Sequence, residues 1–298
     1  MLSFRISGGL ISTLVAVCLC WAMQATADDN QMPAVKVDVL KKGSSASKTH
    51  EQAQSDLPLQ SLTPEQRRRV EGIVKNRSMF RRLPTVGMNS EPALYHYFTH
   101  NPEAAVGIWR VLDISQFKLT PAGPNVWKGD SGDGSQGTIE VLYRSPHQQL
   151  LVCEGEYKSP VLSKPIKTQA VMHLRSSFPA PGKATHAIEH EVDLFVTFPS
   201  QAIDTVAKVI APVSNTIADK NFRELSMFVQ FMSVAMHSQP GWIEQVIQRL
   251  DGVRPEQKEE LMKLSAQIFV AARKAELKQP GVEPASFDQV LAPFQPAK

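Results

Sequence analysis

From Ile114 to Phe198 the apolar residues recur close to every second position, in segments of strand length. Turn-forming sequences such as PAGP at 121–124 and PAPG at 179–182 separate these segments. Consecutive strands joined by short turns pair as an antiparallel meander. The expected strands cover residues 114–119, 125–128, 137–143, 149–157, 167–178 and 186–198.

The last expected hairpin has a predictable register if its turn is centred on Gly182. Opposite charges then meet on one face and mostly apolar residues on the other. The charged face pairs Arg175 with Glu189, His173 with Glu191, and Val171 with Asp193; the apolar face pairs Leu174 with His190, Met172 with Val192, and Ala170 with Leu194. We therefore expect Glu189, Glu191 and Asp193 to be solvated. His190 is either a core histidine with internal partners or a residue that contacts a ligand.

Helical periodicity flanks the strand region on both sides. Thr63-Pro64-Glu65-Gln66 begins a helix, because it combines a capping hydroxyl, a proline at the first position and a capping-box glutamine. We expect helices over 63–82 and from about 90 to 112 before the strands. After them we expect a helical segment from about 200 to 238, interrupted at Pro212, and a last helix over 255–278. The fold class is therefore α+β.

The N-terminus resembles a secretory signal peptide. Residues 1–27 combine Arg5, an apolar stretch and the small residues Ala25-Thr26-Ala27, which predicts cleavage after Ala27 and a secreted or periplasmic protein. Residues 28–60 are polar and aperiodic, which predicts a disordered linker. A single α+β domain is expected over 61–279 and a Pro-rich tail over 280–298. Cys153 is the one cysteine outside the predicted signal peptide, and its apolar neighbours predict a buried, inert thiol.

Several classes of function are excluded or disfavoured by what the chain lacks. The formal net charge of +3 gives no concentrated basic face for nucleic acid. The sequence contains no phosphate-binding glycine loop, dinucleotide fingerprint, nucleophile elbow or His-Glu-x-x-His motif, so we expect no cofactor and no metal. The arginines at 67, 68, 69, 81 and 82 form either a solvated face or a transient contact with anionic lipid headgroups.

The order of elements is similar to that of START-like lipid-binding domains, which have the helix-grip fold. The resemblance is carried by residues 127–137 (WKGDSGDGSQG), 138–143 (TIEVLY) and 150–157 (LLVCEGEY), and by the helix from Phe222 to Met236. It covers about 89–240 and implies a curved antiparallel sheet wrapped around a long C-terminal helix, with extra N- and C-terminal helices outside this core. It also implies an apolar tunnel that holds a lipid, a sterol or a polyketide-like compound.

The Met- and Phe-rich helix after the strands is the feature that points to function. It is either ordinary core or the wall of a ligand cavity, for which flexible methionines are well suited. We expect an exported, non-enzymatic protein that binds a hydrophobic small molecule. The expected lining residues are Val141, Tyr143, Met172, His190, Leu225, Phe228, Met232 and Met236. The alternatives are a structural or partner-binding envelope module and an enzyme of the cyclase or hydrolase type.

Overall fold

The computed structural model describes residues 35–158, 165–180 and 185–277, with the side chains of 201–210 excepted. Within this part of the chain the protein is α+β, with an open, curved antiparallel sheet and a long helix near its C-terminal end. The predicted signal peptide at 1–27 and the tail at 280–298 lie outside the described residues. The strands are β1 (Asp38–Lys41), β2 (Met79–Arg82), β3 (Thr85–Met88), β4 (Lys118–Gly123), β5 (Val126–Asp130), β6 (Ser135–Arg144), β7 (Gln148–Tyr157), β8 (Ile166–Ser177) and β9 (Ile188–Thr197).

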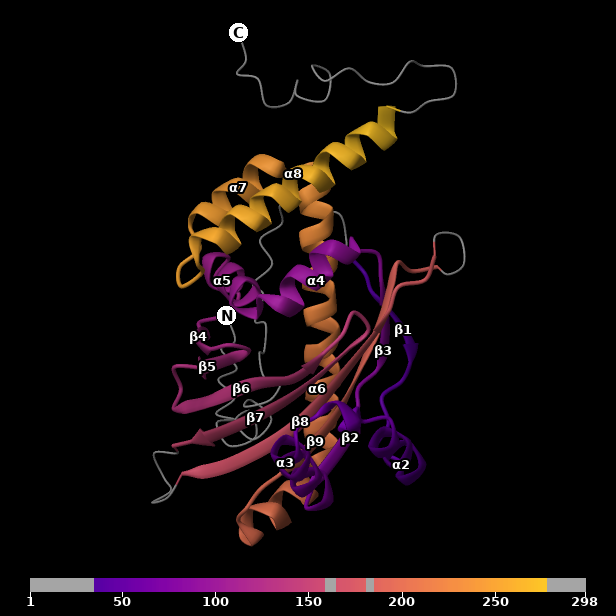
Figure 1. Cartoon of the computed structure of the whole chain (residues 1–298), viewed down its shortest axis with the longest axis vertical. Coiled ribbons are helices and arrows are strands. Elements are labelled where there is room, and N and C mark those ends of the chain that lie inside the picture. The colour runs from indigo at the N-terminus through magenta and orange to yellow at the C-terminus, as the bar shows by residue number, and fades with distance from the viewer. Residues whose placement is uncertain (1–34, 159–164, 181–184, 278–298) are drawn as a thin grey trace, which may run out of the picture.

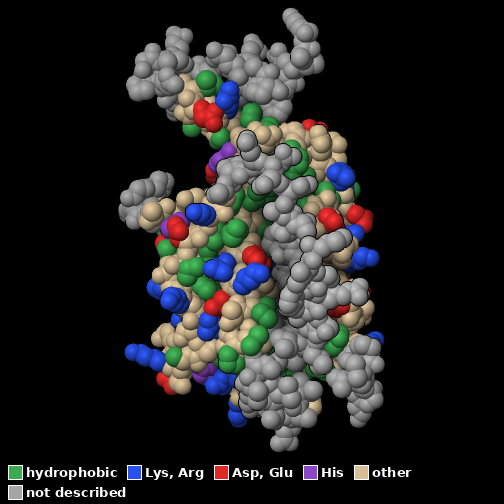
Figure 2. Space-filling view, turned by 180° about the vertical axis from the view of Figure 1, so that it is seen from behind, with side chains coloured by type: hydrophobic (Ala, Val, Ile, Leu, Met, Phe, Trp, Pro, Cys, Tyr) green, Lys and Arg blue, Asp and Glu red, His purple; other side chains and the backbone are tan. Residues whose placement is uncertain are grey.

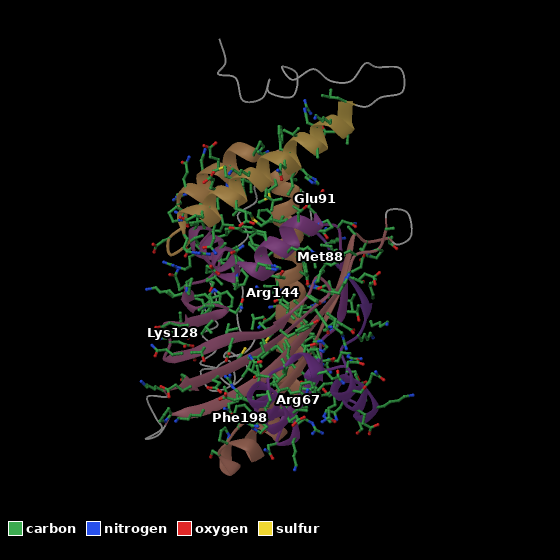
Figure 3. All side chains as sticks on the ribbon, in the orientation of Figure 1. Arg67, Met88, Glu91, Lys128, Arg144 and Phe198 are labelled. Atoms are coloured by element: carbon green, nitrogen blue, oxygen red, sulfur yellow. The ribbon has the colours of Figure 1, made fainter. Side chains whose placement is uncertain are left out.

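Helices lie at one end of the sheet and over both of its faces (Figure 1). Helices α4, α5, α7 and α8 lie at one end, α6 runs along one face, and α2 and α3 lie over the opposite face towards the other end. Figure 3 places Met88 and Glu91 towards the first end, and Arg67 and Phe198 towards the second. The helices are α2 (Ser47–Ser55), α3 (Pro64–Lys75), α4 (Pro92–His100), α5 (Pro102–Val111), α6 (Gln201–Ser238), α7 (Pro240–Gln248) and α8 (Pro255–Leu277), with a short 3-10 turn at Leu59–Ser61.

The sheet has the strand order β1-β3-β9-β8-β7-β6-β5-β4, and β2 also pairs with β9. Strands β4 to β9 follow one another as an antiparallel meander, as predicted, but the strand expected over 114–119 is misplaced. β4 begins at Lys118 and runs to Gly123, into the segment 121–124 that was expected to be a turn, because its backbone pairs with β5 up to that point. Because side chains alternate between the faces of a sheet, each face has its own core. One face carries Val152, Val171 and Phe195 and is covered by α2 and α3. The other face, here called the inner face, carries Leu151, Met172 and Val192 and is turned towards α6.

A row of three glycines crosses the adjacent strands β5, β6 and β7. Gly129, Gly137 and Gly155 lie opposite one another on β5, β6 and β7. A Cβ on Gly137 would lie 2.5 Å from the carbonyl oxygen of Glu154, so the two backbones approach more closely than any larger residue permits. A Cβ on Gly129 would lie 2.7 Å from the ring of Phe117, so this glycine makes room for an aromatic side chain.

The N-terminal predictions need two corrections. The expected disordered linker over 28–60 is wrong for residues 38–60, which contain β1, α2 and the start of the 3-10 turn. Ala53 and Leu57 supply the apolar area that orders this segment, because they are buried against α3 and the sheet. The helix expected over 63–82 ends at Lys75, although its capping box at Thr63 and Gln66 is present, and residues 79–82 form β2.

The predicted β8–β9 register is wrong by two residues. Arg175 pairs with Glu191 rather than Glu189, and His173 pairs with Asp193 rather than Glu191. A shift by two preserves the face of every side chain, so His190 lies on the inner face as expected. Asp193 is not solvated, because it is completely buried and binds both Arg82 and Arg175 beneath α2.

Three of the five arginines proposed as a solvated or lipid-contacting face have carboxylate partners. Arg69 pairs with Glu140 and Glu154, Arg81 with Asp219, and Arg82 with Asp193. The solvated interpretation is therefore wrong for these three, and their pairing ties α3, β2 and α6 to the rest of the fold. Transient lipid contact through Arg67, Arg68, Arg69, Arg81 and Arg82 stays a prediction. On the face shown in Figure 2, positive and negative side chains are interspersed.

Candidate functional site

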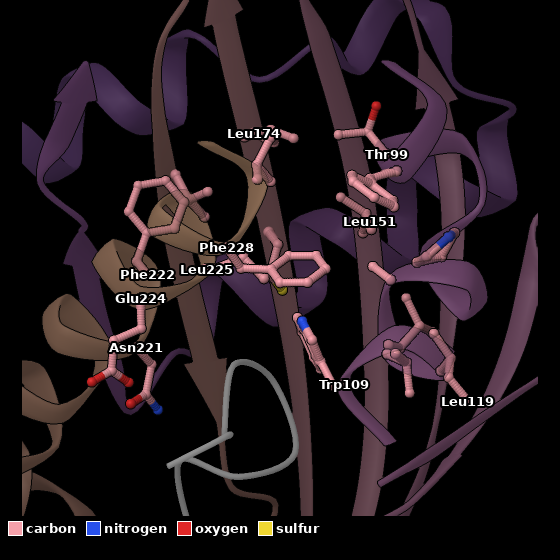
Figure 4. A pocket seen from close by; sticks show the side chains of 18 of the residues that line it. Thr99, Trp109, Leu119, Leu151, Leu174, Asn221, Phe222, Glu224, Leu225 and Phe228 are labelled. Atoms are coloured by element: carbon pink, nitrogen blue, oxygen red, sulfur yellow. The ribbon is translucent and has the colours of Figure 1, made fainter. Parts of the chain in front are cut away.

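A cavity of about 290 Å³ lies between the inner face of the sheet and helices α4, α5 and α6. Figure 4 shows side chains from the strands and from α6 converging on it. Most of its wall is apolar, and aromatic rings from α4, α5, the segment before β4, β5 and α6 contribute. These rings include Phe98, Trp109, Phe117, Trp127, Phe222 and Phe228.

Strand register places the sheet side of this wall. Val141 on β6 lies opposite Leu151 on β7, and Leu151 lies opposite Met172 on β8. All three side chains therefore point to the same face, and all three line the cavity. Cys153 lies two residues beyond Leu151, is 1% exposed and has its Sγ 3.8 Å from Sδ of Met172, so the predicted burial of this thiol is confirmed.

Five of the eight expected lining residues do line the cavity. They are Val141, Met172, His190, Leu225 and Phe228.

Tyr143 does not line the cavity, because a β-bulge changes the alternation of β6. Val141 pairs with Leu151, but Tyr143 pairs with Leu150, so one extra residue is inserted between them. The bulge turns Tyr143 to the opposite face, where it packs on the core beneath α2 and α3.

Met232 and Met236 are also absent from the lining. Both are fully buried further along α6, in the core where α6 meets the helices at the α7 and α8 end of the molecule. This part of α6 is ordinary core, because α4, α7 and α8 cover it. The cavity borders the preceding turns of α6, between Asn221 and Val229.

The sequence analysis did not predict that α4, α5 and the segment at the start of the meander would form part of the cavity wall. Tyr95 and Phe98 of α4, Trp109 of α5, and the segment from Ile114 to Leu119 all line the cavity. Val106, Trp109 and Leu112 recur at helical spacing, which indicates an apolar helix face but not the surface against which that face packs. Trp127 is fixed by its Nε1–H, which donates to Oε2 of Glu103 at 2.8 Å. Glu103 in turn accepts from Nε2 of Gln257 at 2.7 Å, which links α5 and α8 to the cavity wall.

His190 is buried in the cavity wall, and its two ring nitrogens both have internal partners. Nε2 lies 2.8 Å from Oγ of Ser226, and Nδ1 lies 3.2 Å from the hydroxyl of Tyr95. Ser226 donates its proton to the carbonyl oxygen of Phe222 at 2.7 Å, so it must accept from Nε2–H. Nδ1 then accepts from Tyr95, whose oxygen lies 2.6 Å from Oγ of Ser176.

This hydrogen-bond chain assigns a neutral histidine. Burial lowers the pKa of His190 to about 3, and burial also raises the pKa of Tyr95. Since both nitrogens are occupied, His190 presents only ring carbons to the cavity. Of the two interpretations of this residue, the structure favours the core histidine with internal partners.

No group of three or more metal-ligating side chains occurs in the described residues. No helix in the same part of the chain has the length and apolar character needed to cross a membrane.

Comparison with known proteins gives little further information. No protein-family model and no curated protein matches the sequence. Among solved structures, the chain is similar to a conserved protein from Geobacillus kaustophilus, with 12% sequence identity and a TM-score of 0.33. The match covers 49% of this chain and 91% of the other.

Proposed function

We propose that this chain is an exported, non-enzymatic binding protein that holds a hydrophobic small molecule between its sheet and α6. The observation that carries the proposal is the cavity of about 290 Å³ with an apolar and aromatic wall. This volume is close to the lower end of the range, about 300–1,000 Å³, of small-molecule sites. Burial of a ligand's apolar surface contributes about 25 cal/mol per Å² before ordering costs, so such a wall supports binding without specific polar contacts.

The state of His190 favours binding over catalysis. A general base must have a free lone pair directed at the substrate, but the lone pair of Nδ1 faces Tyr95 and the proton of Nε2 faces Ser226. The wall therefore contains a histidine that holds α4 and α6 to the sheet rather than one that exchanges protons with a ligand.

The proposed fold type is the helix grip, in which a curved sheet wraps around a long helix, as in START-like domains. The contacts that support it join β9 to α6: the bond from His190 to Ser226, and ring packing of His190 on Phe222 at 4.5 Å between centroids. Export is supported by the signal-peptide features of residues 1–27.

The test is native mass spectrometry of the protein purified from its host, followed by solvent extraction and identification of any released compound. We expect an apolar compound bound to the folded protein in a one-to-one ratio. For protein stripped of ligand, a titration with decanol should change the fluorescence of Trp109 and Trp127, which line the cavity. Absence of both a co-purifying compound and a saturable fluorescence change would refute the proposal.

A further inference from the structure

The cavity wall is apolar over most of its extent, but one carboxylate lies in it. Among the described lining residues, Glu224 of α6 is the one acidic side chain, and no lysine or arginine lines the cavity. The side chain of Glu224 is 22% exposed, so it is largely removed from water.

The two carboxylate oxygens of Glu224 differ in their surroundings. Oε1 lies 3.5 Å from Nζ of Lys220, a mostly exposed lysine one turn earlier on α6. Oε2 is buried, and no donor among the described residues reaches it. A buried acceptor without a donor is unfavourable. A bound molecule that donates a hydrogen bond to Oε2 would remove this cost, and this would strengthen its binding.

No other side chain of the wall has a buried acceptor atom that lacks a hydrogen-bond donor among the described residues. His190 and Tyr95 are bonded to each other and to serines. Thr99 donates to the carbonyl oxygen of His96, and Ser115 accepts from the backbone N–H of Phe117. Glu224 is therefore the polar group of the wall best placed to select a ligand.

Glu224 belongs to a polar part of the cavity wall that is separate from the aromatic part. Figure 4 shows the polar ends of Glu224 and Asn221 together on α6, away from Trp109 and Leu119. Positions three apart on a helix are neighbours, so these two side chains form one polar edge. Trp109 and Leu119 give the wall an apolar surface on the other side in this view.

From this arrangement, and resting on the proposed function, we infer that the ligand is a single-chain amphiphile whose polar end is a primary amine. The ammonium donates to Oε2 of Glu224, and the apolar chain lies among the aromatic side chains. An ammonium offers both a positive charge and three donors, a hydroxyl offers one donor, and a carboxylate is repelled. The chain as a whole has a formal charge of +3, so a preference for a cation cannot come from its overall charge.

The experiment compares three probes of equal chain length, decylamine, decanol and decanoate, each titrated below its micelle concentration at pH 7. Tryptophan fluorescence and native mass spectrometry report binding to the full mature chain. We expect decylamine to bind at least about tenfold more tightly than decanoate, with decanol between them. Glu224→Gln should reduce the difference between decylamine and decanoate to less than about threefold while decanol binding stays unchanged.

Glu71→Gln is the matched control, because Glu71 is exposed on α3, which covers the other face of the sheet. It removes the same charge and should leave the decylamine preference intact. Thermal melting of both variants establishes that they fold. Equal binding of all three probes to the wild type, or a preference that survives Glu224→Gln, overturns this inference and leaves the proposed function standing. Failure of every probe to bind also overturns this inference, and together with the absence of a co-purifying compound it overturns the proposed function as well.

Discussion

At the scale of single residues, the bonds of His190 make it a neutral connection between three elements. It belongs to β9, and its partners Tyr95 and Ser226 belong to α4 and α6. A buried imidazolium at this position would place two protons against Ser226 and Tyr95, and would force the hydroxyl of Tyr95 to turn away. Acid therefore acts against the connection that holds the two helices to the sheet.

The pKa of His190 predicts a pH dependence of folding. Its folded value of about 3 lies below the ordinary 6.5, so the unfolded chain takes up a proton that the folded chain does not. The stability from this residue is fully present above about pH 6.5 and is lost as the pH falls towards 3. Between pH 7 and pH 5 the loss is about 2 kcal/mol.

The measurement is urea unfolding of the wild type and His190→Gln at both pH values. The variant should be less stable at pH 7, because it loses the bonds to Tyr95 and Ser226. Its free energy of unfolding should fall by about 2 kcal/mol less than that of the wild type on going to pH 5. His173, whose pKa burial lowers to about 4, remains in both proteins and contributes equally. Identical pH dependence in the two proteins would contradict the assignment.

The sequence could place His190 and Asp193 on their faces but could not find their partners. Alternation alone put His190 in the apolar row, and this is confirmed. Asp193 seemed solvated because the face it shares with Arg175 is charged. Its burial comes from α2 and β2, which lie more than 100 positions earlier in the chain. Partners so distant in sequence leave no local pattern.

At the scale of elements, β6 to β9 and the last helix could be predicted from periodicity, because each is long and has regularly spaced apolar residues. The start of the meander is shorter, and the strand expected over 114–119 was misplaced relative to β4. β2, β3 and α2 are short, and they are ordered by tertiary contacts rather than by their own pattern. The bulge between Val141 and Tyr143 is invisible to alternation, since the flanking segments each look regular. This one extra residue is the reason why the prediction that Tyr143 lines the cavity was wrong.

The close approach of β6 and β7 at Gly137 predicts how an alanine there affects stability. Gly137→Ala should destabilise the protein by about 1–3 kcal/mol, because its Cβ would lie 2.5 Å from the backbone of Glu154 and force β6 and β7 apart. Gly72→Ala is the matched control, since this helical glycine has nothing within 4 Å of its Cβ. It should stabilise α3 by about 0.5–1 kcal/mol. Urea unfolding measures both, and a neutral Gly137→Ala would show that the strands do not need this close approach.

At the scale of the whole molecule, α6 has two packing environments. Its middle turns border the cavity at Phe222, Leu225 and Phe228, whereas its later turns are enclosed by α4, α7 and α8 around Met232. Both sets of turns are rich in Met and Phe. The sequence pattern therefore could not show which turns border the cavity and which are packed in the core. Which turns of α6 are enclosed depends on where α4, α7 and α8 pack against it.

Adding bulk to each part of α6 tests this division. Leu225→Trp should fill the cavity, so that decanol binds at least about tenfold more weakly while the free energy of unfolding stays the same or rises. Met232→Trp places the same ring in a closed core and should cost about 1–3 kcal/mol through overpacking, with decanol binding unchanged in the protein that folds. Urea unfolding and fluorescence titration of the two variants separate the outcomes. If Leu225→Trp is as destabilising as Met232→Trp, side chains fill the space beside Leu225, and there is no room in it for a ligand.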